Sequence, residues 1–357
     1  MSTKKHNFYA GPAILPQVVL DQAAEAIREF SGMGLSLLEI SHRSKQFEAV
    51  ISEAESLILE LMGLSSDYSV LFLSGGASSQ FFMIPMNFLN EGETACYVNS
   101  GVWASKAIKE AKLFGNVQVL ASSESDHFTY IPKGFEIPKD ANYLHITSNN
   151  TIYGTQYHEW PESPIPLFCD MSSDIFSRRL NFKSFELIYA GAQKNLGPAG
   201  VTLVVIKKSL LDRGKRKLPA MLDYKTHASN GSMYNTPPVF PIYVTLLTLR
   251  WIQQLGLEHI EKRNQLKATT LYREIDRNSC FSGPVDLKDR SWMNVVFTAK
   301  QADWDPVFLE MCKQAGCVGL AGHRSVGGFR ASLYNALELS SVEALVEVMQ
   351  SFEKKHA

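Results

Sequence analysis

Lys194 lies between two apolar runs that are each typical of a buried strand. The first run covers residues 185–190 and the second covers residues 201–206. The segment between them cannot continue as a strand or an ordinary helix, because a Gly-Pro step follows at residues 197–198. Desolvation of a lysine in such a place lowers the pKa of its amine and makes the amine a nucleophile, as a Schiff-base lysine requires. The alternative is that Lys194 only reaches solvent from a turn.

Asp170 favours the chemical interpretation, because it follows another apolar run at residues 167–169. An acid at the end of one buried strand and a lysine after a later strand fit a pyridoxal phosphate site. There the carboxylate of Asp170 would keep the ring nitrogen protonated, while Lys194 would bind the aldehyde carbon.

The composition of the chain is that of an ordinary globular enzyme. It has 357 residues, of which 45% are hydrophobic and 20% charged, and its formal net charge is -1. This length favours two domains, and this charge gives no reason to expect a nucleic-acid partner. The five cysteines form no CxxC pair, so we expect a reduced, cytoplasmic compartment and no metal site. Residues 1–7 lack the apolar core of a signal peptide, and no stretch is long enough for a membrane span.

Small or polar residues follow several of the predicted strands. A strand over residues 69–73 leads into the small-residue turn 74–79, and a helix is predicted from Gln80. Backbone N–H groups of such a turn can hold a phosphate, which makes Ala77 and Ser78 candidate contacts, although a Gly-Gly turn is more often only a turn. Two further candidates follow apolar runs in the same way, namely Trp103, which could stack on a ring or pack in the core, and Thr151.

Strands alternate with helices from residue 69 to residue 206, which predicts an α/β fold with a mostly parallel sheet covered by helices. Ligands of such sheets bind beyond the carboxyl ends of the strands, where these candidates are expected to meet. A long helical pattern ends at Gly256. We therefore predict a large domain over residues 16–255 and a smaller α/β domain made of residues 1–15 and 256–357.

Cationic residues cluster in two further places. His42 and Arg43 lie in a polar loop between two helical patterns, and His323 and Arg324 lie before a glycine pair. Surface positions would explain most of these residues. A surface position explains the nearby Arg330 poorly, because Arg330 lies within an apolar strand pattern. An anion site is therefore the better interpretation.

Several motifs spread over nearly the whole chain together resemble the phosphoserine aminotransferase family, whose members are class V pyridoxal phosphate enzymes of fold type I. They are FYAGPA at 8–13, ISHR at 40–43, YAGAQKNLGPAG at 189–200, NTPP at 235–238, GHR at 322–324 and GGFRAS at 327–332. The resemblance implies a fold-type I transferase with a large and a smaller domain, and a homodimer whose active sites are shared across the interface.

The resemblance also implies a role for each candidate. Lys194 would be the Schiff-base lysine, Asp170 the partner of the pyridinium nitrogen and Trp103 the stacking ring. Further cofactor contacts would be Ala77, Ser78, Thr151 and Gln193, with Asn235 and Thr236 reaching the neighbouring subunit. Substrate contacts would be Arg330 for the α-carboxylate, and for the phosphate His42 and Arg43 of the partner subunit together with His323 and Arg324.

The activity implied is reversible amino transfer between glutamate and 3-phosphohydroxypyruvate, giving O-phosphoserine and 2-oxoglutarate in serine biosynthesis. The sequence leaves open whether the phosphorylated ketoacid of pyridoxine biosynthesis, which gives 4-phosphohydroxythreonine, is also a substrate. Ser78 departs from relatives that carry an arginine there, so the phosphate must rely on the other cations. The alternatives are a serine–pyruvate type aminotransferase, a cysteine desulfurase with Cys317 as nucleophile, and a non-catalytic module of the same fold.

Overall fold

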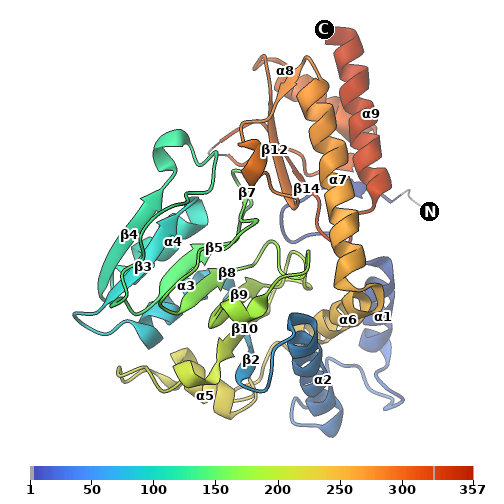
Figure 1. The fold of residues 1–357 in the computed structure, drawn as a ribbon. Coiled ribbons are helices and arrows are strands. Elements are labelled where there is room, and N and C mark those ends of the chain that lie inside the picture. Colours follow the sequence, from blue (N-terminus) through green and yellow to red (C-terminus); the bar gives the residue numbers. More distant parts are fainter. Residues whose placement is uncertain (1–3, 325, 357) are drawn as a thin grey trace.

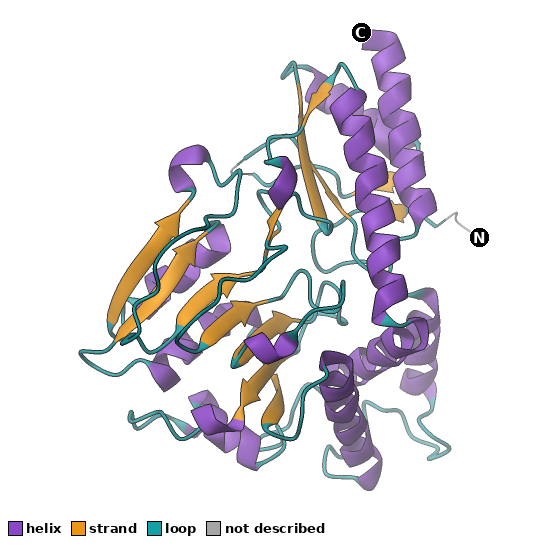
Figure 2. Ribbon diagram, in the orientation of Figure 1, coloured by secondary structure: helices purple, strands orange, loops and turns teal. Residues whose placement is uncertain are grey.

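A seven-stranded sheet forms the centre of the protein in the computed structural model, which describes residues 4–324 and 326–356 (Figures 1 and 2). The strand order is β2-β10-β9-β8-β5-β3-β4, and only β10 runs antiparallel to its neighbours. The strands are β2 (Tyr68–Leu73), β3 (Thr94–Asn99), β4 (Asn116–Ser122), β5 (Leu144–Thr147), β8 (Leu167–Asp170), β9 (Leu187–Gly191) and β10 (Thr202–Lys207). The predicted α/β fold with a mostly parallel sheet is confirmed.

The two faces of this sheet are buried by different helices, because side chains alternate along each strand. In β9, Leu187 and Tyr189 pack in one core, whereas Ile188 and Ala190 pack in the other. The first core contains side chains of α3 (Gly76–Phe88), α4 (Val102–Ala111) and α5 (Tyr224–Ser229), and the second contains those of α2 (Lys45–Met62) and α6 (Val239–Leu255). Helix α1 (Gln17–Arg28) packs on α6. Burial on both faces explains why these strands read as continuous apolar runs.

A smaller antiparallel sheet, in the order β11-β12-β14, lies in the C-terminal part of the chain. Its core is shared with three helices, two of which, α7 and α9, run side by side (Figure 1). These elements are β11 (Phe281–Ser282), β12 (Asn294–Ala299), β14 (Phe329–Ser332), α7 (Leu257–Arg277), α8 (Trp304–Gln314) and α9 (Leu339–His356). Two short pairs complete the strands, β1 (His6–Asn7) with β13 (Cys317–Val318) and β6 (Asn149–Asn150) with β7 (Thr155–Gln156).

The division into domains at residues 255 and 256 stays a prediction. Two observations on the cores support it: Phe8 packs in the same core as α9, and α6 packs in the core of the large sheet. Ile260, in the first turn of α7, packs with the large sheet as well. We therefore propose that the junction of the two domains lies within the first turn of α7.

One predicted boundary is wrong in a way that matters for the site. Helix α3 begins at Gly76 instead of Gln80, because Gly75 adopts a left-handed conformation with φ 99° and serves as the N-cap. Ala77 and Ser78 therefore lie in the first turn of a helix, and not in the turn before it. No helix within residues 4–324 and 326–356 has the length and apolar character needed to cross a membrane.

Candidate active site

A cavity of about 320 Å³ lies beyond the carboxyl ends of the parallel strands. It contains residues from the ends of β5 and β8, from the turn after β9, from the first turns of α3 and α4, and from β14. The predicted site residues that line it are Ala77, Ser78, Trp103, Thr151, Asp170, Gln193, Lys194, His323 and Arg330. The structure thus brings together, at one edge of the sheet, residues that are up to 253 positions apart (330 − 77).

Lys194 lies three residues beyond the end of β9, in a tight turn. The turn is closed by the backbone N–H of Lys194, which donates to the carbonyl of Ala192 at 2.7 Å. Burial lowers the pKa of the Lys194 amine to about 8, the Asp170 carboxylate opposes this shift, and the cation of Arg330 adds to it. At neutral pH a much larger fraction of the amine is therefore neutral than for an exposed lysine, and the neutral amine is the nucleophile.

Asp170 is the last residue of β8, and its side chain is buried. Burial raises the pKa of its carboxyl group, while hydrogen bonds from Ser172 and Tyr189 and the charge of Lys194 oppose the rise. The backbone N–H of Ser172 donates to Oδ1 at 2.9 Å. A buried carboxylate that faces a cavity is costly unless a cationic donor approaches it from the cavity, and a protonated ring nitrogen would be such a donor.

Trp103, Thr151 and Arg330 form the opposite wall. The indole Nε1 of Trp103 donates to Thr151 Oγ1 at 3.0 Å, and Arg330 Nη1 donates to the carbonyl of Thr151 at 3.0 Å. These bonds fix the indole ring beside Lys194, whose Nζ lies 5.9 Å from the ring centroid. The Nε of Arg330 is buried without a partner among the described residues, so the guanidinium retains the capacity to bind an anion in the cavity.

The N-terminus of α3 supplies a second place for an anion. No side chain caps this helix, whose first residues Gly76, Ala77 and Ser78 line the cavity. The uncapped N–H groups and the helix dipole both favour a phosphate. The hydroxyl of Thr147, another lining residue, is buried without a partner in the described part of the chain. An amine, a carboxylate, an aromatic ring and an anion cradle thus surround one cavity, which fits pyridoxal phosphate.

Five predicted residues do not line this cavity. His42 and Arg43 lie in the loop before α2, and the exposed Asn235 and Thr236 lie before α6. These four were expected to serve the neighbouring subunit, so a single chain does not test them. Arg324 was expected in the site of its own chain, but it is exposed and only His323 reaches the lining.

Other lining residues were missed by the sequence reasoning. Ser172 could have been found as the second residue after Asp170, where backbone and hydroxyl donors commonly serve a carboxylate. Lys106 was missed as well; it is not part of the lining, but it lies three residues beyond Trp103 on α4. Its Nζ lies 4.6 Å from the centroid of the Trp103 ring. The remaining lining residues are Ala10, Gly11, Gly76, Phe81, Thr147, Asn149, Ile152 and Ser173.

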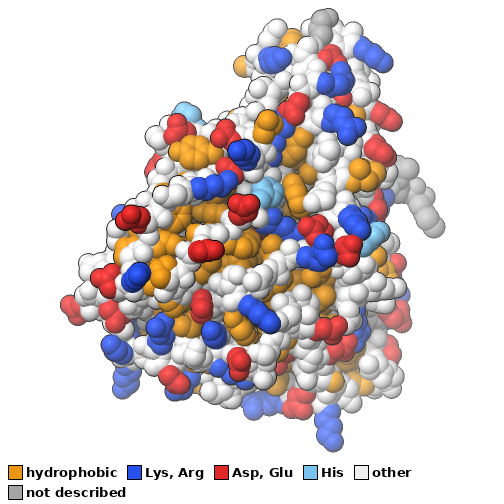
Figure 3. Space-filling model, viewed as in Figure 1, with side chains coloured by type: hydrophobic (Ala, Val, Ile, Leu, Met, Phe, Trp, Pro, Cys, Tyr) orange, Lys and Arg blue, Asp and Glu red, His pale blue; other side chains and the backbone are white. Residues whose placement is uncertain are grey.

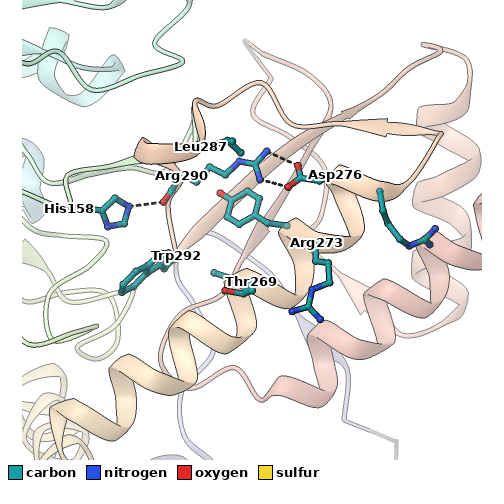
Figure 4. A pocket seen from close by; sticks show the side chains of 10 residues that line it. His158, Thr269, Arg273, Asp276, Leu287, Arg290 and Trp292 are labelled. Atoms are coloured by element: carbon teal, nitrogen blue, oxygen red, sulfur yellow. Dashed lines mark hydrogen bonds and ion pairs between the residues drawn. The ribbon is translucent and has the colours of Figure 1, made fainter.

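A larger and more open hollow, of about 590 Å³, lies between α7 and residues 287–292 (Figure 4). One of its cations is already neutralised, since Arg290 forms two bonds of 2.8 and 2.7 Å with Asp276. His158 points to the same loop and bonds the carbonyl of Arg290 at 2.9 Å. No lysine lines this hollow, so the chemistry of Lys194 and Asp170 has no counterpart there.

The class of protein follows from comparison with known families. The sequence model described as aminotransferase class-V matches residues 5–345. Two curated relatives are the phosphoserine aminotransferases of Flavobacterium johnsoniae, 56% identical over 99% of each chain, and of Bacteroides thetaiotaomicron, 54% identical over 99% of this chain and 100% of the relative. The chain therefore belongs to the phosphoserine aminotransferase family within the class V aminotransferases.

A solved structure agrees with this assignment. The phosphoserine aminotransferase from Bacillus circulans subsp. alkalophilus superposes with a TM-score of 0.97 at 47% identity, and the match covers 100% of both chains. The resemblance that the motifs indicated is thereby confirmed over the full length of the chain.

The cysteine desulfurase alternative finds no support in the site. Cys317 lies in β13, it is 2% exposed, and burial raises the pKa of its thiol to about 11. The other four cysteines are buried and unpaired as well. A desulfurase needs a reactive thiolate that reaches the cofactor, and a buried thiol of raised pKa does not provide one.

Proposed function

We propose that this chain is a pyridoxal phosphate-dependent enzyme that transfers an amino group reversibly between glutamate and 3-phosphohydroxypyruvate, giving O-phosphoserine and 2-oxoglutarate. The observation that carries the proposal is the meeting of Lys194, Asp170, Trp103 and Arg330 around one cavity. Membership of the phosphoserine aminotransferase family, at more than 50% identity to curated members, supports the same reaction.

Each wall of the cavity would hold one part of the cofactor. Lys194 Nζ would bind the aldehyde carbon, Asp170 would accept a hydrogen bond from the ring nitrogen, and Trp103 would cover the ring. The uncapped N-terminus of α3, at Ala77 and Ser78, would hold the phosphate, with Thr151 and Gln193 as further contacts. Bound pyridoxal phosphate supplies the electron sink that makes the Cα proton of an amino acid acidic.

Residues of the protein would then position the substrate and move the proton of its Cα. Once displaced by the substrate amino group, the Lys194 amine would be the base that takes the proton from the substrate Cα and the acid that delivers it to the carbon that had carried the aldehyde. A pKa of about 8 suits this role, because an amine close to the working pH serves as base and as acid. Asp170 keeps its negative charge beside the ring nitrogen, and Arg330 holds the α-carboxylate of either substrate.

The distal anion of the substrate would bind at the mouth of the cavity, near His323. Desolvation lowers the pKa of His323, and the charges of Arg330, Lys106 and Arg324 lower it further, so several cations lie near one another there. Such a cluster favours a phosphate dianion and accepts the γ-carboxylate of glutamate at the same place. Ser78 adds no charge to this cluster.

A homodimer would complete this anion site. His42, Arg43, Asn235 and Thr236 do not line the cavity of their own chain. We assign all four to the cavity of the partner, His42 and Arg43 for the distal anion of the substrate and Asn235 and Thr236 for the cofactor phosphate. Large apolar side chains are exposed near these loops, among them Leu38 at 60%. Figure 3 shows hydrophobic side chains gathered across the middle of one face, where the sheet meets the upper part of the molecule.

A place in serine biosynthesis follows from this reaction, and we assign the enzyme to the cytoplasm because its five cysteines are unpaired. We also propose that the phosphorylated ketoacid of pyridoxine biosynthesis competes for the same site, since it presents the same two anions.

The test is a comparison of amino acceptors. Purified protein should show the absorbance of bound pyridoxal phosphate, and with glutamate it should aminate 3-phosphohydroxypyruvate at least about 100-fold more efficiently than pyruvate or glyoxylate. Two ionic contacts of roughly 1.5 kcal/mol each would produce this preference. Equal or better use of the unphosphorylated acceptors would overturn the proposal in favour of a serine–pyruvate type enzyme, and a colourless, inactive protein would favour a non-catalytic module.

A further inference from the structure

Behind Asp170, the sheet contains a buried polar chain that the proposed reaction does not yet use. Tyr189 is the register partner of Asp170 in the neighbouring parallel strand, and its hydroxyl lowers the pKa of the Asp170 carboxyl group in the way a hydrogen-bond donor does. The same hydroxyl lies 3.0 Å from Nε2 of His145, in β5. Tyr189 is fully buried and His145 is 1% exposed, so water does not replace these bonds.

The direction of each hydrogen bond follows from the number of protons available. Tyr189 has one hydroxyl proton, and a carboxylate can only accept, so that proton points to Asp170. The Tyr189 oxygen must then accept a bond from His145, which places the single imidazole proton on Nε2. Burial lowers the pKa of His145 to about 3, so the ring is neutral and carries only that proton.

The other ring nitrogen agrees with this assignment. Nδ1 of His145 is buried and has no hydrogen-bond partner among the described residues, as suits a nitrogen without a proton to place. The ring is held between Tyr97 and Tyr189, at centroid distances of 5.0 and 5.8 Å, and cannot turn easily to exchange the two nitrogens. The Nε2–H of His145 therefore points to the Tyr189 oxygen, and the Tyr189 hydroxyl points to Asp170.

We propose that Tyr189 and His145 are positioning residues that hold Asp170 in its ionised form and thereby keep the ring nitrogen of the cofactor protonated. This inference rests on the proposed function, in which Asp170 is the partner of that nitrogen. Tyr189 and His145 stabilise the buried carboxylate of Asp170 from inside the sheet. No substrate reaches these two side chains. Ser172 and Lys194 act on Asp170 from the cavity side, and Asp174 is a like charge that interacts with Asp170.

A matched control is present in the same layer. Tyr143 is also fully buried, and its hydroxyl lies 2.8 Å from that of Tyr97, away from Asp170. Tyr143→Phe and Tyr189→Phe each remove one buried hydroxyl and leave one buried partner group without its bond. They should therefore cost similar stability, but only Tyr189→Phe removes a donor from Asp170.

The experiment compares two cofactors on the full chain after removal of the native cofactor. One is pyridoxal phosphate, and the other is its 1-deaza analogue, in which a C–H replaces the ring nitrogen. Binding is followed by absorbance titration. Tyr189→Phe should weaken pyridoxal phosphate about tenfold, the effect of one hydrogen bond to a charged group. Its affinity for the deaza analogue should stay within about twofold of wild type, because a less ionised Asp170 does not harm a neutral C–H. Tyr143→Phe should change neither affinity.

Variants of His145 extend the test. His145→Leu should behave as a weaker form of Tyr189→Phe, and His145→Gln should recover part of the loss, because its amide N–H can donate to the Tyr189 oxygen. If Tyr189→Phe weakens both cofactors alike, or weakens pyridoxal phosphate no more than Tyr143→Phe does, Tyr189 has only a structural role and the inference is wrong. A wild-type protein that does not bind pyridoxal phosphate would instead overturn the proposed function, and this inference with it.

Discussion

The sheet side of the cavity holds its charged groups buried and hydrogen-bonded, whereas the loop side carries them exposed. Asp170 and Lys194 belong to the sheet side. Burial raises the pKa of Asp170 and lowers the pKa of Lys194, which favours the neutral form of each group. The exposed side chains of Arg43 and Arg324 belong to the loop side, and neither lines the cavity of its own chain. One chain therefore contains the groups proposed for the ring and the aldehyde carbon of the cofactor, whereas the cofactor phosphate and the distal anion of the substrate each also need residues proposed to come from the partner subunit.

This difference has a physical reason. A proton can be moved between carbon atoms only by groups whose pKa values are shifted, and such shifts require burial among fixed partners. The distal group is a phosphate in one substrate and a carboxylate in the other, so the cations that bind it must adapt to both. Long side chains on exposed loops provide this at a low desolvation cost. A subunit interface can then bury these cationic side chains around the bound substrate.

The largest effect should come from the sheet side. Lys194→Ala should lower turnover by about 10⁴-fold or more, because both the covalent attachment of the cofactor and the acid–base group are lost. Both half-reactions should be followed in single-turnover absorbance measurements, with circular dichroism and gel filtration to show that the fold and assembly are kept. Partial recovery of the rate with added methylamine would support the proton-transfer role. Turnover within about tenfold of wild type would exclude Lys194 as the catalytic base.

Arg330→Gln should reduce kcat/KM about 10- to 100-fold for glutamate and for the phosphorylated ketoacid alike, because both present an α-carboxylate. It should also move a pH midpoint. Capture of the cofactor requires the neutral amine of Lys194, so its rate should rise with pH through about 8 in the wild type. The charge of Arg330 lowers that pKa, so the midpoint should lie at higher pH in the variant, as stopped-flow absorbance would show. A penalty confined to one substrate would contradict this role.

Arg43→Gln tests the loop side and the dimer together. We expect a loss of about 10-fold in kcat/KM for the phosphorylated ketoacid and a smaller loss for glutamate, whose distal group carries less charge. Mixed dimers of Arg43→Gln and Lys194→Ala chains give a sharper result. If Arg43 serves the partner's cavity, each mixed dimer has one active site with both defects and one with neither, so the mixture should regain activity. Failure to regain it would place Arg43 in the cavity of its own chain.

The sequence predicted that Asp170 and Lys194 lie close together, because their positions depend on local order along the chain; their chemical roles stay predictions. Apolar runs that end in Asp170 and Lys194 show where buried strands stop, and parallel strands place those ends at one edge. The start of α3 was misplaced, because small residues such as Gly76 and Ala77 fit a turn as well as the first turn of a helix. The packing partners of Asp170 were not predicted at all. Tyr189 and His145 lie inside apolar runs, where the pattern indicates only burial.

The loop side could be predicted only by resemblance. Nothing in the local sequence of His42 or Asn235 distinguishes a residue that serves a partner subunit from one that faces solvent, since both lie in polar loops. Lys106 was missed for a different reason. Its role depends on the ring of Trp103 and on the distant His323, and a helical pattern alone shows neither contact.

The smallest expected effect concerns Lys106, which lies on α4 beside the ring of Trp103. Its Nζ lies 4.6 Å from the centroid of the Trp103 ring, and its charge lowers the pKa of His323. Since the side chain is exposed, the ionic contribution is modest, and Lys106→Met should lower kcat/KM for the phosphorylated ketoacid about two- to fivefold. The methionine keeps an apolar stem against the indole, so the cofactor spectrum should not change.

Lys112→Met is the matched control for this variant. Lys112 is exposed at the end of the same helix, roughly 9 Å further along its axis, so it removes the same charge away from the cavity. It should leave kcat/KM for both substrates within about 1.5-fold of wild type, an effect at the lower limit for an exposed charge. The loss in Lys106→Met should also shrink as salt rises, because an exposed contact is screened. Equal kinetics of the two variants at low salt would show that the indole holds Lys106 without directing its charge to the substrate, and that the anion is bound by the loop side alone.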